Sequence, residues 1–264
     1  MNKFRLTCLI FFLITTISYS QKRPPEPEEN KYSLIEVMMA AGISAGISPA
    51  QNNTSAGNGK FIDLSSTYYF SDLGIGISLG NFSNPIKKEK LDNIITTYPI
   101  KFNSENWKTN YYGIGPNYRI NIGKIKTVIF GRAGLMYVKP ISLKGNFIPE
   151  DPQSPINSVA VYNFSKKETS IIGFYNVGVR FGYKLNPNFG LYISASYLSS
   201  FSDKIIAQDG RKQFTDINND GIITETDIVS EEGTLVDFQY TEKKIHPQVF
   251  NFGIGLSYSF RIEK

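Results

Sequence analysis

The last stretch of the sequence, residues 250–262, alternates strictly between two kinds of side chain. Apolar or aromatic residues occupy every second position, and small or polar residues fill the positions between them. The apolar set is Phe250, Phe252, Ile254, Leu256, Tyr258, Phe260 and Ile262. Side chains share a face every 3.6 residues in a helix but every two residues in a strand, so the pattern predicts a β-strand with one apolar face.

Seven further segments carry the same alternation, so the sequence predicts an all-β protein of eight strands. They are residues 35–47, 60–70, 73–80, 112–122, 129–137, 175–185 and 189–197. Glycines recur on the small-residue side of these segments. Glycine on the inner face of a small barrel makes room for larger neighbours, so these positions favour a packed interior over a phosphate-binding loop.

The links between the predicted strands are alternately short and long. Tight turns occupy residues 71–72, 123–124 and 186–188. Long links occupy residues 48–59, 84–106, 140–166 and 201–243. Outer-membrane barrels combine short periplasmic turns with long extracellular loops, so we expect an eight-stranded antiparallel transmembrane up-and-down β-barrel. The structural alternative is a soluble lipocalin-like barrel, which would place the apolar face inside.

The first twenty residues have the organisation of a secretory signal peptide. Lys3 and Arg5 form a basic start, residues 6–17 are apolar, and small residues precede a cleavage site after residue 20. The only cysteine, Cys8, lies in this segment. The exported chain is therefore expected to contain no disulfide and no thiolate metal site.

Residues 21–31 are rich in proline and charge and predict a solvated periplasmic leader, and residues 32–264 form the predicted barrel domain. Without Lys3 and Arg5 the chain carries 26 basic and 23 acidic residues. This small excess in an exported chain gives no support to nucleic-acid binding.

Residues 32–262 resemble small eight-stranded outer-membrane β-barrels of the OmpA/OmpX-like type, in the form common in Bacteroidetes. The resemblance rests on the signal peptide, the alternating links and the aromatic-ended last strand at residues 253–260. It implies a place in the outer membrane of a Gram-negative bacterium, in contact with outer-membrane lipid. It also implies an aromatic girdle near the periplasmic turns, formed by Tyr68, Phe70, Tyr118, Phe181, Tyr183, Phe189, Tyr258 and Phe260.

Several charged residues fall on the predicted inner face of the barrel. They are Glu36, Asp63, Arg119, Arg132, Arg180, Lys184 and Arg261. Eight strands enclose space only for side chains, so these charges must pair or bind water. We expect Arg132 and Arg180 to point inward and to pair with acidic or polar partners such as Glu36 or Asp63. The favoured interpretation is an ion-paired plug, and the alternative is a narrow, porin-like cationic pore.

The sequence lacks the nucleotide-binding, metalloprotease and serine-hydrolase motifs that would indicate an enzyme. His246 is the only histidine, so a Ser/His/acid site would have to use it. A surface histidine at the extracellular start of the last strand is the favoured interpretation. The predicted protein is therefore non-enzymatic and acts through its extracellular loops or through envelope partner contacts. The alternative role is a subunit of an outer-membrane protein-secretion apparatus.

The last long link contains a segment that resembles an EF-hand or dockerin-type calcium loop. Oxygen ligands would come from Asp216, Asn218, Asp220, the carbonyl of Ile222 and Asp227, with Gly221 at the sharp turn. Residues 213–242 hold eight acidic residues and no Lys or Arg, which favours a bound cation. We therefore expect Ca²⁺ here. The alternative is an Asp-Gly hairpin turn in an acidic loop.

Overall fold

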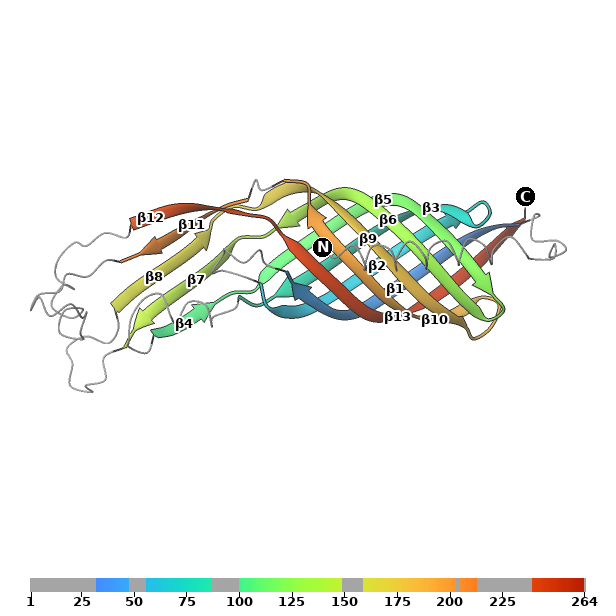
Figure 1. The fold of residues 1–264 in the computed structure, drawn as a ribbon, viewed down its shortest axis with the longest axis horizontal. Helices are drawn as coiled ribbons and strands as arrows, with labels where there is room; N and C mark the ends of the chain where they lie inside the picture. Colours follow the sequence, from blue (N-terminus) through green and yellow to red (C-terminus); the bar gives the residue numbers. More distant parts are fainter. Residues whose placement is uncertain are drawn as a thin grey trace, which may run out of the picture.

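The computed structural model describes residues 32–47, 56–86, 100–148, 159–202, 205–212 and 239–263. Eight strands close into a barrel in the order β1-β13-β10-β9-β6-β5-β3-β2 (Figure 1). Their bounds are Tyr32–Gly46 for β1, Asn58–Tyr69 for β2, Leu73–Asn84 for β3, Trp107–Ile122 for β5, Ile125–Val138 for β6, Ser170–Lys184 for β9, Phe189–Ser200 for β10 and Gln248–Glu263 for β13. Each strand predicted from the sequence is one of these eight.

The predicted fold class, an antiparallel up-and-down barrel, is confirmed by the pairing of the strands. Each barrel strand pairs antiparallel with the barrel strand that comes next along the chain, as β2 does with β3 and β5 with β6. The first and last strands close the barrel, with Tyr32 opposite Glu263 and Gly46 opposite Val249. Within the described ranges, no helix is long and apolar enough to cross a bilayer.

The turns at one end of the barrel are as tight as the sequence predicts. Residues 123–124 alone separate β5 from β6, and Gly123 has a φ of 58°. That left-handed conformation is unfavourable for residues with a Cβ, so glycine suits the first position of this turn. The first strand begins at Tyr32 and the last strand ends at Glu263. Both of these residues lie at the end of the barrel that carries the tight turns (Figure 1).

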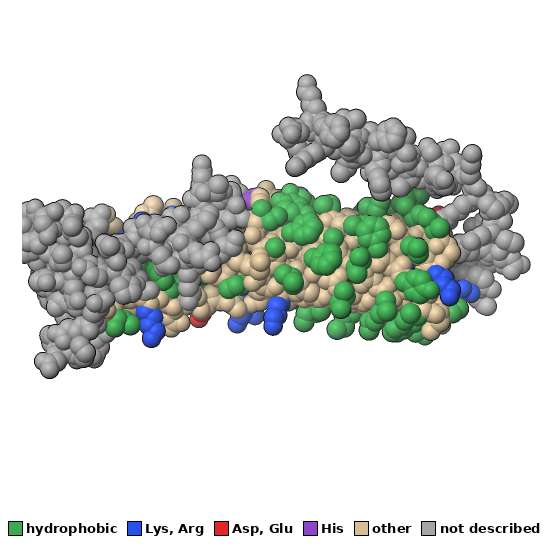
Figure 2. Space-filling view, turned by 60° about the horizontal axis from the view of Figure 1, so that its bottom comes forward, with side chains coloured by type: hydrophobic (Ala, Val, Ile, Leu, Met, Phe, Trp, Pro, Cys, Tyr) green, Lys and Arg blue, Asp and Glu red, His purple; other side chains and the backbone are tan. Residues whose placement is uncertain are grey.

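The wall of the barrel has an apolar outside, whereas its inside combines polar residues, glycines and a set of buried apolar side chains. In β3, for example, the side chains of Leu73, Ile75, Ile77 and Leu79 are exposed, and the residues between them are buried or glycine. Exposed apolar side chains are spread over the face of the barrel drawn in Figure 2. The predicted girdle residues also face outward, and Tyr68, Phe70, Phe181 and Phe260 are all exposed.

Parts of the long links, which the sequence predicts as extracellular loops, form a second sheet. Its order is β12-β11-β8-β7-β4, and it continues the barrel at the end opposite the tight turns (Figure 1). The bounds are Ile100–Ser104 for β4, Ile141–Phe147 for β7, Val159–Lys166 for β8, Ile205–Arg211 for β11 and Gln239–Ile245 for β12. These strands are short, and a bulge between Gly145 and Asn146 shifts the register of β7 against β8. Strands of five to eight residues, one of them with a bulge, leave little period-two signal, so the pattern did not predict them.

An apolar cluster fills the barrel where it meets the second sheet. Tyr111 lies at its centre, with ring centroids 5.6 Å from Phe174 and 6.4 Å from Phe82. The cluster extends into the second sheet, because Trp107 at the start of β5 packs against Phe164 of β8 with ring centroids 6.2 Å apart. A Cβ at Gly80 would lie 2.3 Å from the Tyr111 ring, so glycine at this position admits the buried tyrosine.

Candidate functional site

Two ion pairs cross the lumen of the barrel from one wall to the other. Glu36 on β1 pairs with Lys126 on β6, and Asp63 on β2 pairs with Arg180 on β9 at 3.2 Å. In the closed order of eight strands the members of each pair lie four strands apart, so each pair spans the lumen. Tyr111 also donates a hydrogen bond to Asp63 Oδ2 at 2.7 Å. The lumen is therefore bridged twice by charged groups, once next to the tight turns and once further along the barrel.

The structure gives Arg180 the carboxylate partner that the sequence suggested, but it gives Arg132 a different kind of partner. Arg132 Nη1 donates to the backbone carbonyls of Gly131, Gly115 and Pro116, at 2.7, 3.1 and 3.1 Å. Both carboxylates that the sequence suggested as partners are already engaged, Glu36 by Lys126 and Asp63 by Arg180. Arg132 is 3% exposed, and its Nε and Nη2 atoms have no hydrogen-bond partner. Its charge is instead stabilised by carbonyl dipoles and by the ring of Phe130, 5.5 Å from Arg132 Cζ.

Sequence reasoning missed Lys126, although a signal for it was present. The predicted strand begins at residue 129 and the predicted turn ends at residue 124, so residues 125–128 belong to neither. Extending the alternation backward from Arg132 places residue 126 on the same inward face. Lys126 is only 9% exposed, which agrees with a side chain that points into the barrel.

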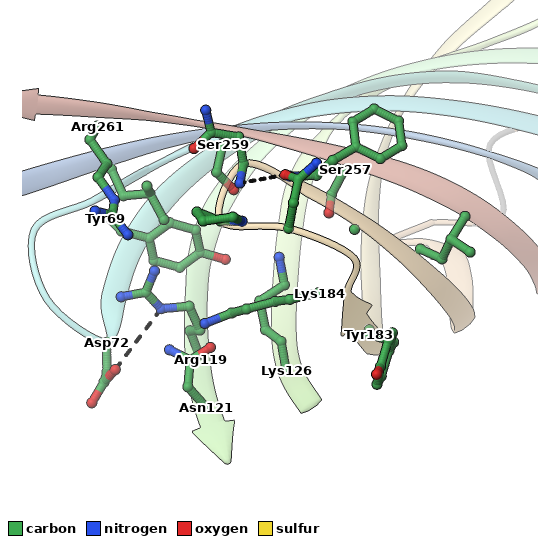
Figure 3. A pocket seen from close by; sticks show the side chains of 18 of the residues that line it. Tyr69, Asp72, Arg119, Asn121, Lys126, Tyr183, Lys184, Ser257, Ser259 and Arg261 are labelled. Atoms are coloured by element: carbon green, nitrogen blue, oxygen red, sulfur yellow. Dashed lines mark hydrogen bonds and ion pairs between the residues drawn. The ribbon is translucent and has the colours of Figure 1, made fainter. Parts of the chain in front are cut away.

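A basic cavity opens at the end of the barrel that carries the tight turns. It has a volume of about 480 Å³, and we call it the basic mouth. Four cations and one carboxylate line it: Arg119, Lys126, Lys184, Arg261 and Asp72. Ser257 and Ser259 of β13 add hydroxyl groups, and Figure 3 shows all these side chains around the opening. The sequence placed Arg119, Lys184 and Arg261 on the inner face, and the structure brings them together at this end.

Arg119 is held firmly at the rim of the basic mouth. Its Nη2 donates to the carbonyl of Ser71 at 3.2 Å, and its Cζ lies 4.7 Å from the centroid of the Tyr69 ring. Asp72 Oδ1 lies 4.0 Å from Arg119 Nε, and that carboxylate side chain is 49% exposed. Exposed ion pairs at this distance contribute little, so Arg119 owes its orientation mainly to the ring and the carbonyl.

His246 lies at the junction of the barrel and the second sheet and contacts two serines. Ser199 Oγ shares a hydrogen bond with His246 Nε2 at 2.9 Å, and Ser200 Oγ lies 3.3 Å from Nδ1. Ser199 is 0% and Ser200 2% exposed, whereas His246 is half-buried. A buried hydroxyl cannot reach a substrate carbonyl in solvent, so this geometry favours a structural link between β10 and the start of β13 over a nucleophile.

The second sheet has its own charged cluster, centred on Asp209 of β11. The carboxylate is 3% exposed, lies 3.6 Å from Arg211 Nη2 and also pairs with Lys243. Burial raises the pKa of the neighbouring Tyr162 phenol, and the Asp209 charge raises this pKa further. The cluster joins β8, β11 and β12 of the second sheet.

The predicted calcium ligands Asp216, Asn218, Asp220, Ile222 and Asp227 lie outside the described residues, as do residues 1–20 and the leader at 21–31. Within the described ranges, no three His, Cys, Asp or Glu side chains gather as a metal site would require.

No protein-family model and no curated protein sequence matches the chain. Solved structures similar to it include Ail, the attachment invasion locus protein of Yersinia pestis, at 16% identity and a TM-score of 0.40, covering 88% of this chain and 99% of Ail. A major outer membrane protein from Thermus thermophilus matches at 12% identity and a TM-score of 0.43, covering 86% of this chain and 99% of its own. Neisserial surface protein A matches at 13% identity and a TM-score of 0.38, covering 87% of this chain and 97% of its own. Likeness at this level carries no argument about function, and the fold assignment rests on the strand pairing of this chain.

Proposed function

We propose that this chain is an integral outer-membrane β-barrel of a Gram-negative bacterium, without enzymatic activity, that acts through its extracellular part or through envelope partners. The observation that carries the proposal is the outer wall of the barrel. Large apolar side chains on all eight barrel strands are exposed there, including Met39, Ile62, Ile114 and Ile193. A soluble protein rarely exposes an apolar surface of this extent, whereas a lipid bilayer solvates it.

The two ends of the barrel support an orientation in the membrane. Bacterial barrels place tight turns in the periplasm and long segments outside the cell. The second sheet would then stand in the extracellular space, and the basic mouth would face the periplasm. Outward aromatic residues near the turns, such as Tyr183 and Tyr258, suit the level of the lipid head groups.

The packing of the lumen favours a closed barrel over the porin-like alternative. The apolar cluster around Tyr111 fills one end, and the Glu36–Lys126 and Asp63–Arg180 pairs bridge the lumen. Conductance across planar bilayers distinguishes the two roles, because a closed barrel leaves the current at its baseline, whereas a cationic pore adds discrete anion-selective steps.

Location is the first testable consequence. The protein should fractionate with the outer membrane and require detergent for extraction. On a gel it should migrate at different positions with and without boiling, because a closed barrel resists detergent until it is heated. Recovery in the soluble periplasmic fraction without detergent would contradict the proposal.

A role as a subunit of an envelope assembly, such as a protein-secretion apparatus, is the second candidate. Among the described strands, β12 and β4 each pair with one neighbour only, so they form the two edges of the described part of the second sheet. Open edges are sites at which another chain can add a strand. Co-purification from native membranes under mild detergent tests this role, since an isolated barrel would elute without a stoichiometric protein partner.

We also propose that residues 216–227 bind Ca²⁺ in the extracellular space, with a dissociation constant on the order of 10⁻⁴–10⁻³ M, as is typical of extracellular calcium modules. Calcium should protect the link from protease nicking in the wild type, and chelator should remove the protection. The Asp216→Ala/Asp220→Ala variant should be cut equally with and without calcium. Glu231→Ala/Glu232→Ala removes the same charge outside the motif and should keep the protection. Equal cleavage of the wild type in calcium and in chelator would reduce the motif to an acidic turn.

A further inference from the structure

The basic mouth gathers donors from several strands around one space. Arg119 comes from β5, Lys126 from β6, Lys184 from β9, and Ser257, Ser259 and Arg261 from β13 (Figure 3). Because these strands lie on different sides of the barrel opening, their polar groups approach a ligand from several directions. The cavity of about 480 Å³ is large enough for a small polar ligand.

The charge of the basic mouth favours an anion. Its lining has four cations against the single carboxylate of Asp72, and the Glu36 carboxylate beneath it is already paired with Lys126. Counting both acids still leaves two positive charges in excess. A concave site with walls of low dielectric concentrates this potential more than an open surface would.

The guanidinium of Arg119 is placed in advance of any ligand. Its contacts with Ser71 and the Tyr69 ring fix its orientation, and its side chain is 13% exposed. Its Nε is buried and has no hydrogen-bond partner. A guanidinium held in this way loses little conformational freedom when it binds an oxyanion.

The number of donors distinguishes between classes of anion. A carboxylate has two oxygens in one plane, which one guanidinium can satisfy. A phosphate group has three or four oxygens in a tetrahedral arrangement, and it suits donors that arrive from separate strands, with guanidinium, ammonium and hydroxyl groups together. We propose that the basic mouth is a binding site for a phosphate group, from a lipid head group or from a free phosphate compound.

The test uses the full mature chain in a maltoside detergent and a phosphate-free buffer, because detergents with phosphate head groups would compete. Inorganic phosphate is titrated and followed by calorimetry and by the ³¹P line width. Binding by the wild type should be saturable, and Arg119→Gln and Lys184→Gln should each weaken it at least tenfold. Lys124→Gln removes a charge at the same end without lining the cavity, and it should bind as the wild type does.

Heat-dependent gel migration checks that each variant is folded, and Lys184→Gln keeps the test valid if Arg119→Gln does not fold. The proposal is overturned if the wild type shows no saturable binding, if Lys124→Gln loses as much affinity as the lining variants, or if acetate competes as well as phosphate.

Titration with glycerophosphoglycerol, a phosphate diester, distinguishes a lipid head group from a free phosphate compound as the source of the phosphate. Equal affinity for this diester indicates a lipid head group, whereas tenfold weaker binding indicates free phosphate or a monoester.

Discussion

Arg180→Leu should lower the free energy of unfolding by about 3–5 kcal/mol, the usual effect of breaking a buried ion pair. The side chains of Arg180 and Asp63 are 4% and 8% exposed, so water cannot take over the role of the lost partner. The substitution leaves the Asp63 carboxylate with only the hydrogen bond from Tyr111. It also removes the guanidinium that packs 4.4 Å from the centroid of the Phe130 ring. Urea titration of the barrel in lipid vesicles measures the change.

A double variant separates the charge from the packing. Asp63→Leu/Arg180→Leu removes both members of the pair, so no unpaired carboxylate remains in the lumen. Its destabilisation should be smaller than the sum of the two single variants, because replacing a whole buried pair with apolar groups is often close to neutral. If Arg180→Leu leaves the urea midpoint unchanged, water screens the pair and the lumen is not closed at this level.

Ile254→Arg should destabilise the protein in a bilayer by about 2–4 kcal/mol, the cost of a cation on the lipid-facing side near the middle of a membrane barrel. Ile254 is 70% exposed and lies near the middle of β13, opposite Ala41 of β1 and Ile193 of β10. In water an exposed isoleucine could be replaced by arginine at little cost. The expected loss therefore depends on the solvent around the barrel.

Ile206→Arg is the matched control for this prediction. Ile206 lies in β11 of the second sheet and is 51% exposed, so the change in the side chain is the same but the expected surroundings are aqueous. Its effect should stay within about 0.5 kcal/mol, as for most surface substitutions. Equal, small effects at both positions would place the barrel wall in water and contradict the membrane assignment.

The eight barrel strands and their inward and outward faces could be predicted because both depend on local sequence. Successive side chains of a strand point to opposite faces, so the alternation in residues 250–262 determines which side chains of β13 face out, whatever the partner strands are. The alternating lengths of the links determine the up-and-down order in the same local way. The second sheet could not be predicted in this way because its strands are only five to eight residues long, and β7 also carries a bulge after Gly145.

Only the tertiary structure decided which inward charges meet. Glu36 and Lys126 are 90 positions apart and lie on strands that are not neighbours, and the same holds for Asp63 and Arg180. Their meeting depends on closure of the barrel and on the stagger of eight strands, which sets the height of each side chain along the axis. The alternation shows whether a side chain points into the barrel or out of it, but it does not give the position of that side chain along the barrel axis. The sequence therefore identified Arg132 as an inward cation, whereas the closed barrel gave it carbonyl partners and paired Lys126 with Glu36.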